Sequence, residues 1–161
     1  MRRVWIGGIA LLAVVSSSPA LAQEKSSSEG ATVGTLGVRG GFSLTPDQFV
    51  IGAQVSLGKK LGIARVVPSV DVGLGSSVTT IAFNGDLQVR LSVEGSKFSL
   101  YGGAGPTLLY TDDEGGSGRW DVGLTLLAGC HVPIRVLPFN FEARFGVGDV
   151  PDFRGLIILE L

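Results

Sequence analysis

The chain has 161 residues, of which 17% are charged, and its formal net charge is −1 at pH 7. This length suits one domain, and the near-neutral charge gives no support for nucleic-acid binding, which requires clustered basic residues. A single cysteine excludes an internal disulfide framework and any metal site built from several cysteines. The 25 glycines disfavour a helical bundle, because each glycine in a helix costs about 1 kcal/mol relative to alanine.

The N-terminus has the pattern of a secretory signal peptide. Two arginines precede an apolar stretch at 4–15, and Ala20-Leu21-Ala22 supplies a small-x-small cleavage pattern. The apolar stretch is too short to span a bilayer comfortably. We therefore expect residues 1–22 to be removed on export, residues 23–33 to form a flexible polar lead-in, and residues 34–161 to form the folded domain.

After residue 33 the chain divides into runs in which apolar and polar side chains alternate. In the first run, Leu36, Val38 and Phe42 share one face, whereas Arg39 and Ser43 share the other. Such alternation is typical of strands with one apolar and one polar face. Eight such runs follow one another, at 35–44, 48–57, 64–74, 79–91, 98–110, 120–132, 139–147 and 153–161.

Eight alternating runs joined by short turns are compatible with two architectures. In a soluble barrel of the lipocalin type, the apolar faces point inward around a lipid ligand. In an outer-membrane barrel, the apolar faces meet lipid and the polar faces line the lumen. The aromatic residues favour the membrane barrel, because they gather at the ends of the runs as interfacial girdles do. They are Phe42, Phe49, Tyr110, Trp120 and Phe153 beside alternate turns, with Phe98 and Phe139 at the opposite ends.

The polar faces carry ten charged residues whose charges balance, five arginines against five acids. A closed interior needs this balance, because an unpaired buried charge costs several kcal/mol. The expected lumen charge network consists of Arg39, Arg65, Asp71, Asp86, Arg90, Asp121, Glu142, Arg144, Arg154 and Glu160. An eight-stranded barrel is just wide enough for side chains to fill, so we expect this network to plug the lumen. The alternative is a narrow channel, or an interior that binds a small molecule or lipid.

If the N-terminus lies in the periplasm, the even number of strands fixes which turns reach the cell surface. The surface turns are then 45–47, 75–78, 111–119 and 148–152, and the periplasmic turns are 58–61, 93–96 and 133–138. Of the surface turns only 111–119 is long, acidic and flexible, so Asp112, Asp113 and Glu114 are the candidate surface-interaction residues. They could collect a divalent cation, but residues 115–118 do not continue the spacing of a calcium loop. A solvated acidic loop is the simpler interpretation.

Four segments carry a resemblance to a known family. LGVRGGFSL at 36–44, SLYGGAGPTLLY at 99–110, DVGLTLLAGCHVPI at 121–134 and FEARFGVGD at 141–149 resemble the outer-membrane β-barrel domain family of Gram-negative envelopes, the porin-like or opacity-protein-like barrels. In that family a glycine-rich first strand, an aromatic-Gly-Gly-x-Gly-Pro fifth strand and a seventh strand of the type FxEARxxxG recur. The resemblance implies an eight-stranded barrel inserted by the outer-membrane assembly machinery. The chain departs from the family at its last residue, Leu161, where members usually end in an aromatic residue.

Some eight-stranded outer-membrane barrels are enzymes, so a catalytic set is one possibility for this chain. A Ser–His–acid arrangement needs a histidine beside a nucleophile, and His131, the only histidine, has neither a serine nor a carboxylate beside it in the sequence. Cys130 falls on the apolar face and is expected to act as a small hydrophobe. We therefore expect no enzyme activity, no cofactor and no metal.

Taken together, the sequence predicts an all-β protein. It is an eight-stranded antiparallel up-and-down transmembrane barrel preceded by a cleavable signal peptide. Its expected location is the outer membrane, where it would be a monomer with a structural or surface-interaction role. Its expected partners are outer-membrane lipid, the insertion machinery and an extracellular ligand of unknown identity.

Overall fold

The computed structural model describes residues 33–57, 60–61, 63–92, 95, 97–113, 118–134 and 138–161. The expected signal peptide, all but the last residue of the expected lead-in, and Glu114 lie outside these ranges. In the part of the chain that is described, no helix is long and apolar enough to cross a membrane. The strands are β1 (Val33–Leu44), β2 (Asp47–Leu57), β3 (Lys60–Leu61), β4 (Ala64–Leu74), β5 (Val78–Ser92), β6 (Ser99–Asp113), β7 (Arg119–Val132), β8 (Phe139–Gly148) and β9 (Phe153–Glu160).

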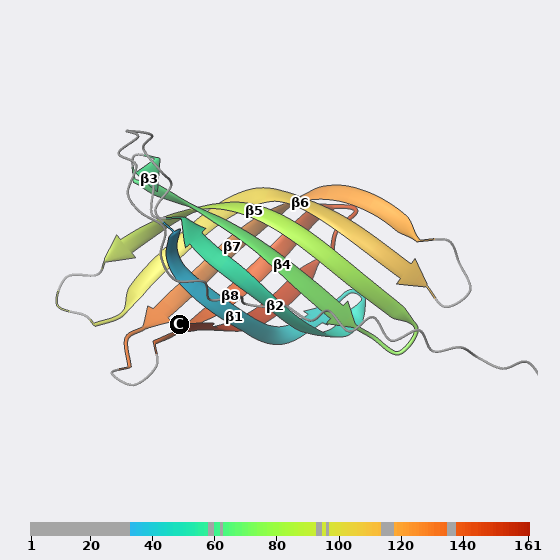
Figure 1. Ribbon diagram of the computed structural model, residues 1–161, viewed down its shortest axis with the longest axis horizontal. Helices are drawn as coiled ribbons and strands as arrows, with labels where there is room; N and C mark the ends of the chain where they lie inside the picture. Colours follow the sequence, from blue (N-terminus) through green and yellow to red (C-terminus); the bar gives the residue numbers. More distant parts are fainter. Residues whose placement is uncertain are drawn as a thin grey trace, which may run out of the picture.

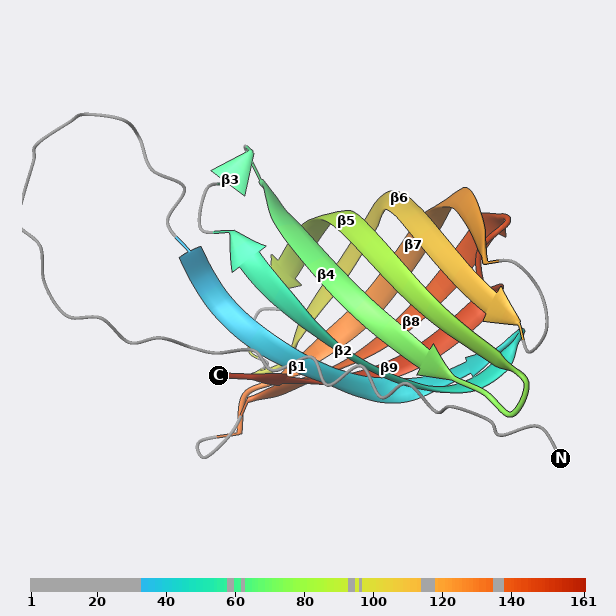
Figure 2. The ribbon, with the colours of Figure 1, turned by 45° about the vertical axis from the view of Figure 1, so that its right-hand side comes forward.

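Eight of these strands close into an antiparallel barrel (Figures 1 and 2). Consecutive strands pair with one another, β1 pairs with β9, and β2 pairs with β4 to complete the ring. The two-residue β3 pairs with the start of β4 at the rim, where the sequence predicted only a turn at 58–61. The eight-stranded up-and-down barrel is thereby confirmed, with one short added strand.

The strands are strongly staggered. Residues directly opposite one another trace a path that begins at Leu100 on β6 and returns to the same strand at Tyr110. The intermediate positions are Cys130, Phe141, Ile157, Gly40, Ile51, Val72 and Ile81. One circuit therefore advances ten residues along β6, and this shear tilts the strands relative to the barrel axis (Figure 2). Because of the tilt, side chains from strands distant in the sequence meet at one height in the lumen.

The apolar faces of the strands point outward. On β1, Leu36, Val38 and Phe42 are each about half exposed, whereas Arg39 and Ser43 on the other face are buried. Every barrel strand contributes at least one exposed large hydrophobic residue to this outer surface. A water-soluble protein places such residues inside, so the structure contradicts the lipocalin-type alternative.

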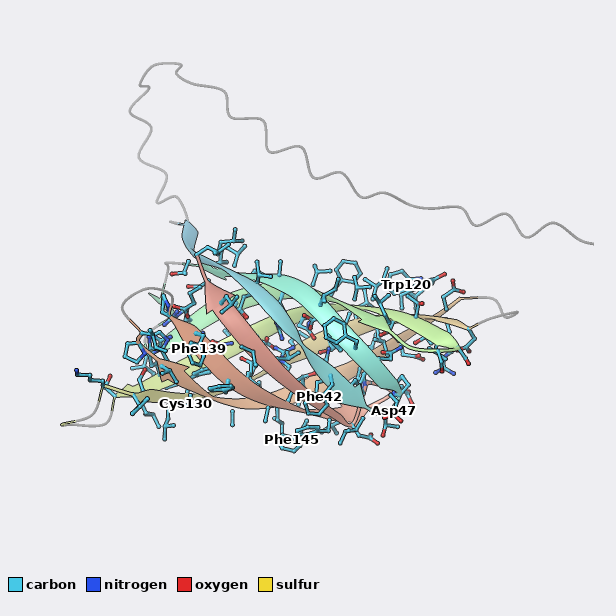
Figure 3. All side chains as sticks on the ribbon, turned by 90° about the horizontal axis from the view of Figure 1, so that it is seen from below. Phe42, Asp47, Trp120, Cys130, Phe139 and Phe145 are labelled. Carbon is cyan, nitrogen blue, oxygen red and sulfur yellow. The ribbon has the colours of Figure 1, made fainter. Side chains whose placement is uncertain are left out.

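Aromatic rings gather near both ends of the outer surface (Figure 3). We call the end of the barrel that carries Val33 and Leu161 the terminal end. At the opposite end, Phe153 contacts Phe42 and Phe145, with ring centroids 6.3 and 5.3 Å apart, and Trp120 packs at 5.0 Å from Tyr110. At the terminal end, the rings of Phe139 and Phe141 lie 5.2 Å apart, edge to face. These two bands have the positions expected from the sequence.

Candidate functional site in the barrel lumen

Six charged side chains from five strands meet in the middle of the lumen. They are Arg39 on β1, Asp71 on β4, Asp86 on β5, Glu142 and Arg144 on β8, and Arg154 on β9, and we call them the central cluster. None is more than 4% exposed. With three guanidinium groups against three carboxylates the cluster is neutral as a whole, which is the condition under which buried charges are tolerated.

Each arginine of the central cluster contacts a carboxylate from another strand. Arg39 lies 3.2 Å from Asp71 through Nε and 3.4 Å from Glu142 through Nη2. Arg154 Nη1 lies 3.3 Å from Asp71 Oδ2. Arg144 donates from Nε to Glu142 at 2.9 Å and from Nη2 to Asp86. The cluster therefore ties β1, β8 and β9 to β4 and β5 across the lumen.

Neutral hydrogen bonds extend the cluster around the rest of the wall. Asn84 on β5 donates from Nδ2 to Ser69 and to Asp71, both at 3.1 Å. Its carbonyl accepts a bond of 2.9 Å from Thr107 on β6, whose hydroxyl lies 2.7 Å from that of Thr125 on β7. Thr107 and Thr125 are fully buried. The central cluster and these bonds together thus connect seven of the eight barrel strands, namely β1 and β4 to β9.

Tyr101 covers the cluster on the side of Leu161. Its hydroxyl donates to Glu142 Oε2 at 3.0 Å, and the residue is only 6% exposed. The neighbouring strand makes room for its ring with Gly129, where an added Cβ would collide with the ring atoms. The sequence places Tyr101 on the lumen face but gives no sign of this bond, since the two residues are 41 positions apart.

Apolar residues pack together at the end of the lumen opposite Leu161. Val150, in the turn between β8 and β9, packs with Ala82 and Leu109 in a buried cluster. The turn is held over the barrel by a hydrogen bond from the amide of Gly146 to the carbonyl of Asp152, 3.0 Å long. The turn therefore places an apolar layer over part of this end of the lumen.

Sequence reasoning missed the apolar part of the lumen. Besides Ala82 and Leu109, the buried hydrophobic residues of the strands include Val50, Val67, Leu127, Leu156 and Ile158. Each occupies a position on the polar face of its run. Because the residues next to it in the sequence are also apolar, it looks like part of a continuous apolar stretch. Counting in steps of two residues from the nearest lumen charge assigns these residues to the lumen face, because side chains alternate along a strand. Ile158, for example, is four residues from Arg154 and lies on the same face.

The four remaining charges of the predicted network lie apart from the central cluster. Arg90 and Glu160 pair at 3.8 Å near the terminal end, where Arg65 donates to the hydroxyl of Ser56 at 3.3 Å. Asp121 lies at the other end and pairs with the exposed Arg119 at 2.8 Å. The expectation of one ten-member network is therefore corrected to three groups at different heights.

The structure also places the other residues singled out from the sequence. His131 Nδ1 lies 2.7 Å from Asn140 Oδ1, so its partner is an amide and not a nucleophile. Cys130 lies on the outer face between Leu100 and Phe141. Of the acidic surface residues, Asp112 and Asp113 are exposed at the end of β6. Within the described residues, no group of three or more potential metal ligands comes together.

Comparison with known proteins finds no family model and no curated protein that matches the chain. Among solved structures it is similar to the N-terminal β-barrel domain of OprF from Pseudomonas aeruginosa, with a TM-score of 0.60 and 9% identity over 78% of this chain and 93% of that one. It also matches Neisserial surface protein A (TM-score 0.47, 15% identity, 78% and 89% coverage) and the outer-membrane enzyme PagL (0.48, 8%, 80% and 99%). At these identities the likeness concerns the fold, which is that of the outer-membrane β-barrels.

Proposed function

We propose that this chain is a small integral protein of the outer membrane with a structural or surface-interaction role and no catalytic activity. In this proposal the signal peptide directs export, and the insertion machinery places the barrel in the membrane as a monomer. The observation that carries the proposal is the inside-out distribution of side chains. Apolar residues cover the outside, whereas a neutral group of six buried charges fills the centre.

The exterior matches a lipid environment in composition and in pattern. Half-exposed leucine, valine and phenylalanine side chains cover the barrel wall between the two aromatic bands. In water, an apolar surface of this extent would drive association, whereas in a bilayer it needs no partner other than lipid. A closed barrel also leaves no unpaired strand edge along its wall, and this is the condition for spanning a membrane with strands.

The interior supports a structural role over conduction. Ions would have to pass both the apolar layer of Val150 and the central cluster, whose arginines and carboxylates already contact one another. Opening that path means separating buried opposite charges, which costs several kcal/mol per pair. We therefore expect no steady conductance when the protein is reconstituted in planar bilayers. The alternative, a narrow channel, requires conductance that Arg90→Ala abolishes.

The end away from the termini supports a role in surface contacts. Asp112 and Asp113 are exposed there, at the start of the one long predicted surface loop, 111–119. The other turns at this end are short, so they offer little material for recognition. A positively charged extracellular ligand would fit this acidic rim best.

The proposal is tested by fractionation of cells that express the full chain. We expect the mature protein in the detergent-extracted outer-membrane fraction, starting at Gln23, with faster gel migration before heating than after. Unheated migration reports a folded barrel, because such barrels resist unfolding by detergent at room temperature. Recovery of the mature protein in the soluble periplasmic fraction would contradict the proposal.

A further inference from the structure

A hollow of about 300 Å³ opens at the end of the barrel opposite Leu161, next to the apolar layer of Val150. Part of its lining is apolar, since the buried Leu109 and Val150 face it together with Pro46 and Pro151. The rest of the lining is polar and comes from the nearby ends of β5, β6 and β7 and from the turns that precede β2 and β9. A volume of this size lies at the lower end of the range for small-molecule sites.

Two carboxylates line the hollow without a close partner. Asp113 at the end of β6 and Asp149 in the turn before β9 are exposed, and among the described residues neither has a cation within 4.0 Å. Both attract Arg119 from a longer distance, but Arg119 itself pairs with Asp121 at 2.8 Å. The undescribed stretch that follows Asp113 in the sequence, 114–117, reads EGGS and contains no basic residue. The two carboxylates are therefore open to a cation from solution.

Threonine hydroxyls make up most of the remaining polar lining. The hydroxyl of Thr80 is buried and donates to Gln48 Oε1 at 2.8 Å, so its proton is already used. The hydroxyls of Thr45 and Thr111 have no hydrogen-bond partner in the part of the chain that the structure describes. Hydroxyl and carboxylate oxygens both accept hydrogen bonds, and an ammonium group brings three N–H donors with one positive charge. The polar lining therefore suits an ammonium group.

Building on the surface-contact role proposed above, we propose that this hollow binds a small organic cation, an ammonium group on a short apolar chain. The ammonium group donates to Asp113 and Asp149, because charge-assisted hydrogen bonds are stronger than those between neutral groups. The hydrocarbon chain packs against Leu109 and Val150 and thereby leaves water. A bare metal ion makes no use of the apolar lining, and within the described ranges no three potential metal ligands come together.

The probe is n-butylammonium, added to the folded mature barrel in a deuterated detergent. Saturation-transfer NMR, in which the methyl protons of the protein are irradiated, should detect the butyl protons above the background of empty micelles. n-Butanol has the chain without the charge and should give a several-fold weaker signal. Ammonium chloride has the charge without the chain, and at matched ionic strength an equimolar amount should not displace n-butylammonium.

Two double variants separate this site from the general negative charge at this end of the barrel. Asp113→Asn combined with Asp149→Asn should weaken binding roughly tenfold, since each exposed ion pair contributes at most a factor of about five. The matched control is Asp47→Asn combined with Asp152→Asn. It removes two exposed carboxylates from the same end (Figure 3), but neither is among the described lining residues, so binding should change less than twofold.

Heat-dependent gel migration is measured for every variant, so that loss of binding is separated from loss of the fold. If the double variant at the hollow does not fold, Arg119→Gln tests the site with the opposite sign, because it removes the cation that competes for Asp113 and Asp149. Stronger binding by Arg119→Gln supports the proposal, and unchanged or weaker binding contradicts it.

Three further results would overturn the proposal: no transfer to n-butylammonium above empty micelles, an equal signal from n-butanol, or equal weakening by the two double variants. Each of these results, obtained with a barrel that migrates as folded, rejects the cation site alone. The outer-membrane location is tested separately by fractionation, so the two failures are distinguishable.

Discussion

Arg144 on β8 donates from Nη2 to Oδ2 of Asp86 on β5, so one buried ion pair crosses the lumen between strands that are separated by β6 and β7. Both side chains are at most 1% exposed. Among the described residues no other cation lies within 4.0 Å of Asp86. The pair therefore links two halves of the wall through the interior, independently of the hydrogen bonds between neighbouring strands.

This pair predicts a strongly non-additive effect on stability. Arg144→Gln leaves Asp86 buried without a cation, and Asp86→Asn leaves Arg144 with one carboxylate fewer. Each should lower the free energy of unfolding by about 3–5 kcal/mol. The double variant should lose clearly less than the sum, because neither charge is then left alone. Urea unfolding of the refolded barrel in lipid, followed by Trp120 fluorescence, measures all three.

Arg119→Gln serves as the control for this comparison of the two single variants with the double variant. Its ion pair with Asp121 is formed by a side chain that is 72% exposed, and surface pairs contribute only about 0–1 kcal/mol. Strictly additive losses for Arg144→Gln and Asp86→Asn would show that the two groups do not depend on each other in the folded protein.

On the outer face of β7, the loss of stability caused by an added charge should depend on how deep the substituted residue lies in the membrane. Leu126 lies near the middle of the strand and Val122 near its aromatic end, and both point outward, 45% and 68% exposed. In a bilayer, Leu126→Arg should destabilise the barrel by about 2–4 kcal/mol, whereas Val122→Arg should cost about 0–1 kcal/mol. Unfolding measured in lipid vesicles gives both values. A soluble protein would tolerate arginine equally at the two exposed positions, so equal small losses would argue against a membrane location.

Trp120 predicts where the barrel sits relative to the bilayer. After removal of residues 1–22 it is the single tryptophan of the chain, and its ring contacts Tyr110 and Phe83 in the aromatic band. Tryptophan prefers the interface between headgroups and hydrocarbon. Lipids brominated close to the headgroup should therefore quench its fluorescence more strongly than lipids brominated near the chain end. Trp120→Phe, which removes the signal, gives the background, and stronger quenching from the chain end would refute the expected position.

Replacing glycine by alanine should have different effects on stability at Gly105, where two strands approach closely, and at Gly40, where they do not. An added Cβ at Gly105 on β6 would collide with the carbonyl oxygen of Gly85 on β5, a backbone atom that cannot turn away. Gly105→Ala should therefore cost about 1–3 kcal/mol, as overpacking does. At Gly40, on the outer face of β1, nothing lies within 4 Å of an added Cβ, so Gly40→Ala should be nearly neutral. Equal unfolding midpoints for the two variants would contradict this.

The local pattern was sufficient for much of the fold. The alternation in residues 35–44 predicts that Arg39 and Phe42 lie on opposite faces, and the structure places them so. Side-chain direction along a strand repeats every two residues, which is a property of the chain itself.

The local sequence pattern could not predict which lumen charges pair with one another. Balance among ten charged residues predicts that they pair, but not that Arg39 reaches Glu142 from 103 positions away. Which charges meet depends on their height in the lumen, and height depends on the stagger of every strand pair between them. Arg65 and Asp121 therefore lie at opposite ends of the barrel and outside the central cluster. The sequence alone does not distinguish them from Arg144, which belongs to the cluster.

The sequence by itself determined that this chain forms eight long strands, which side chains share a face, and that the apolar faces suit lipid, because the two-residue period of an extended backbone separates the apolar from the polar side chains. Only the tertiary structure decided that six of the ten charges make a neutral cluster, which carboxylate each arginine of that cluster contacts, and that Val150 packs over one end of the lumen. Closure and shear of the barrel set these features, and they depend on all strand pairs together.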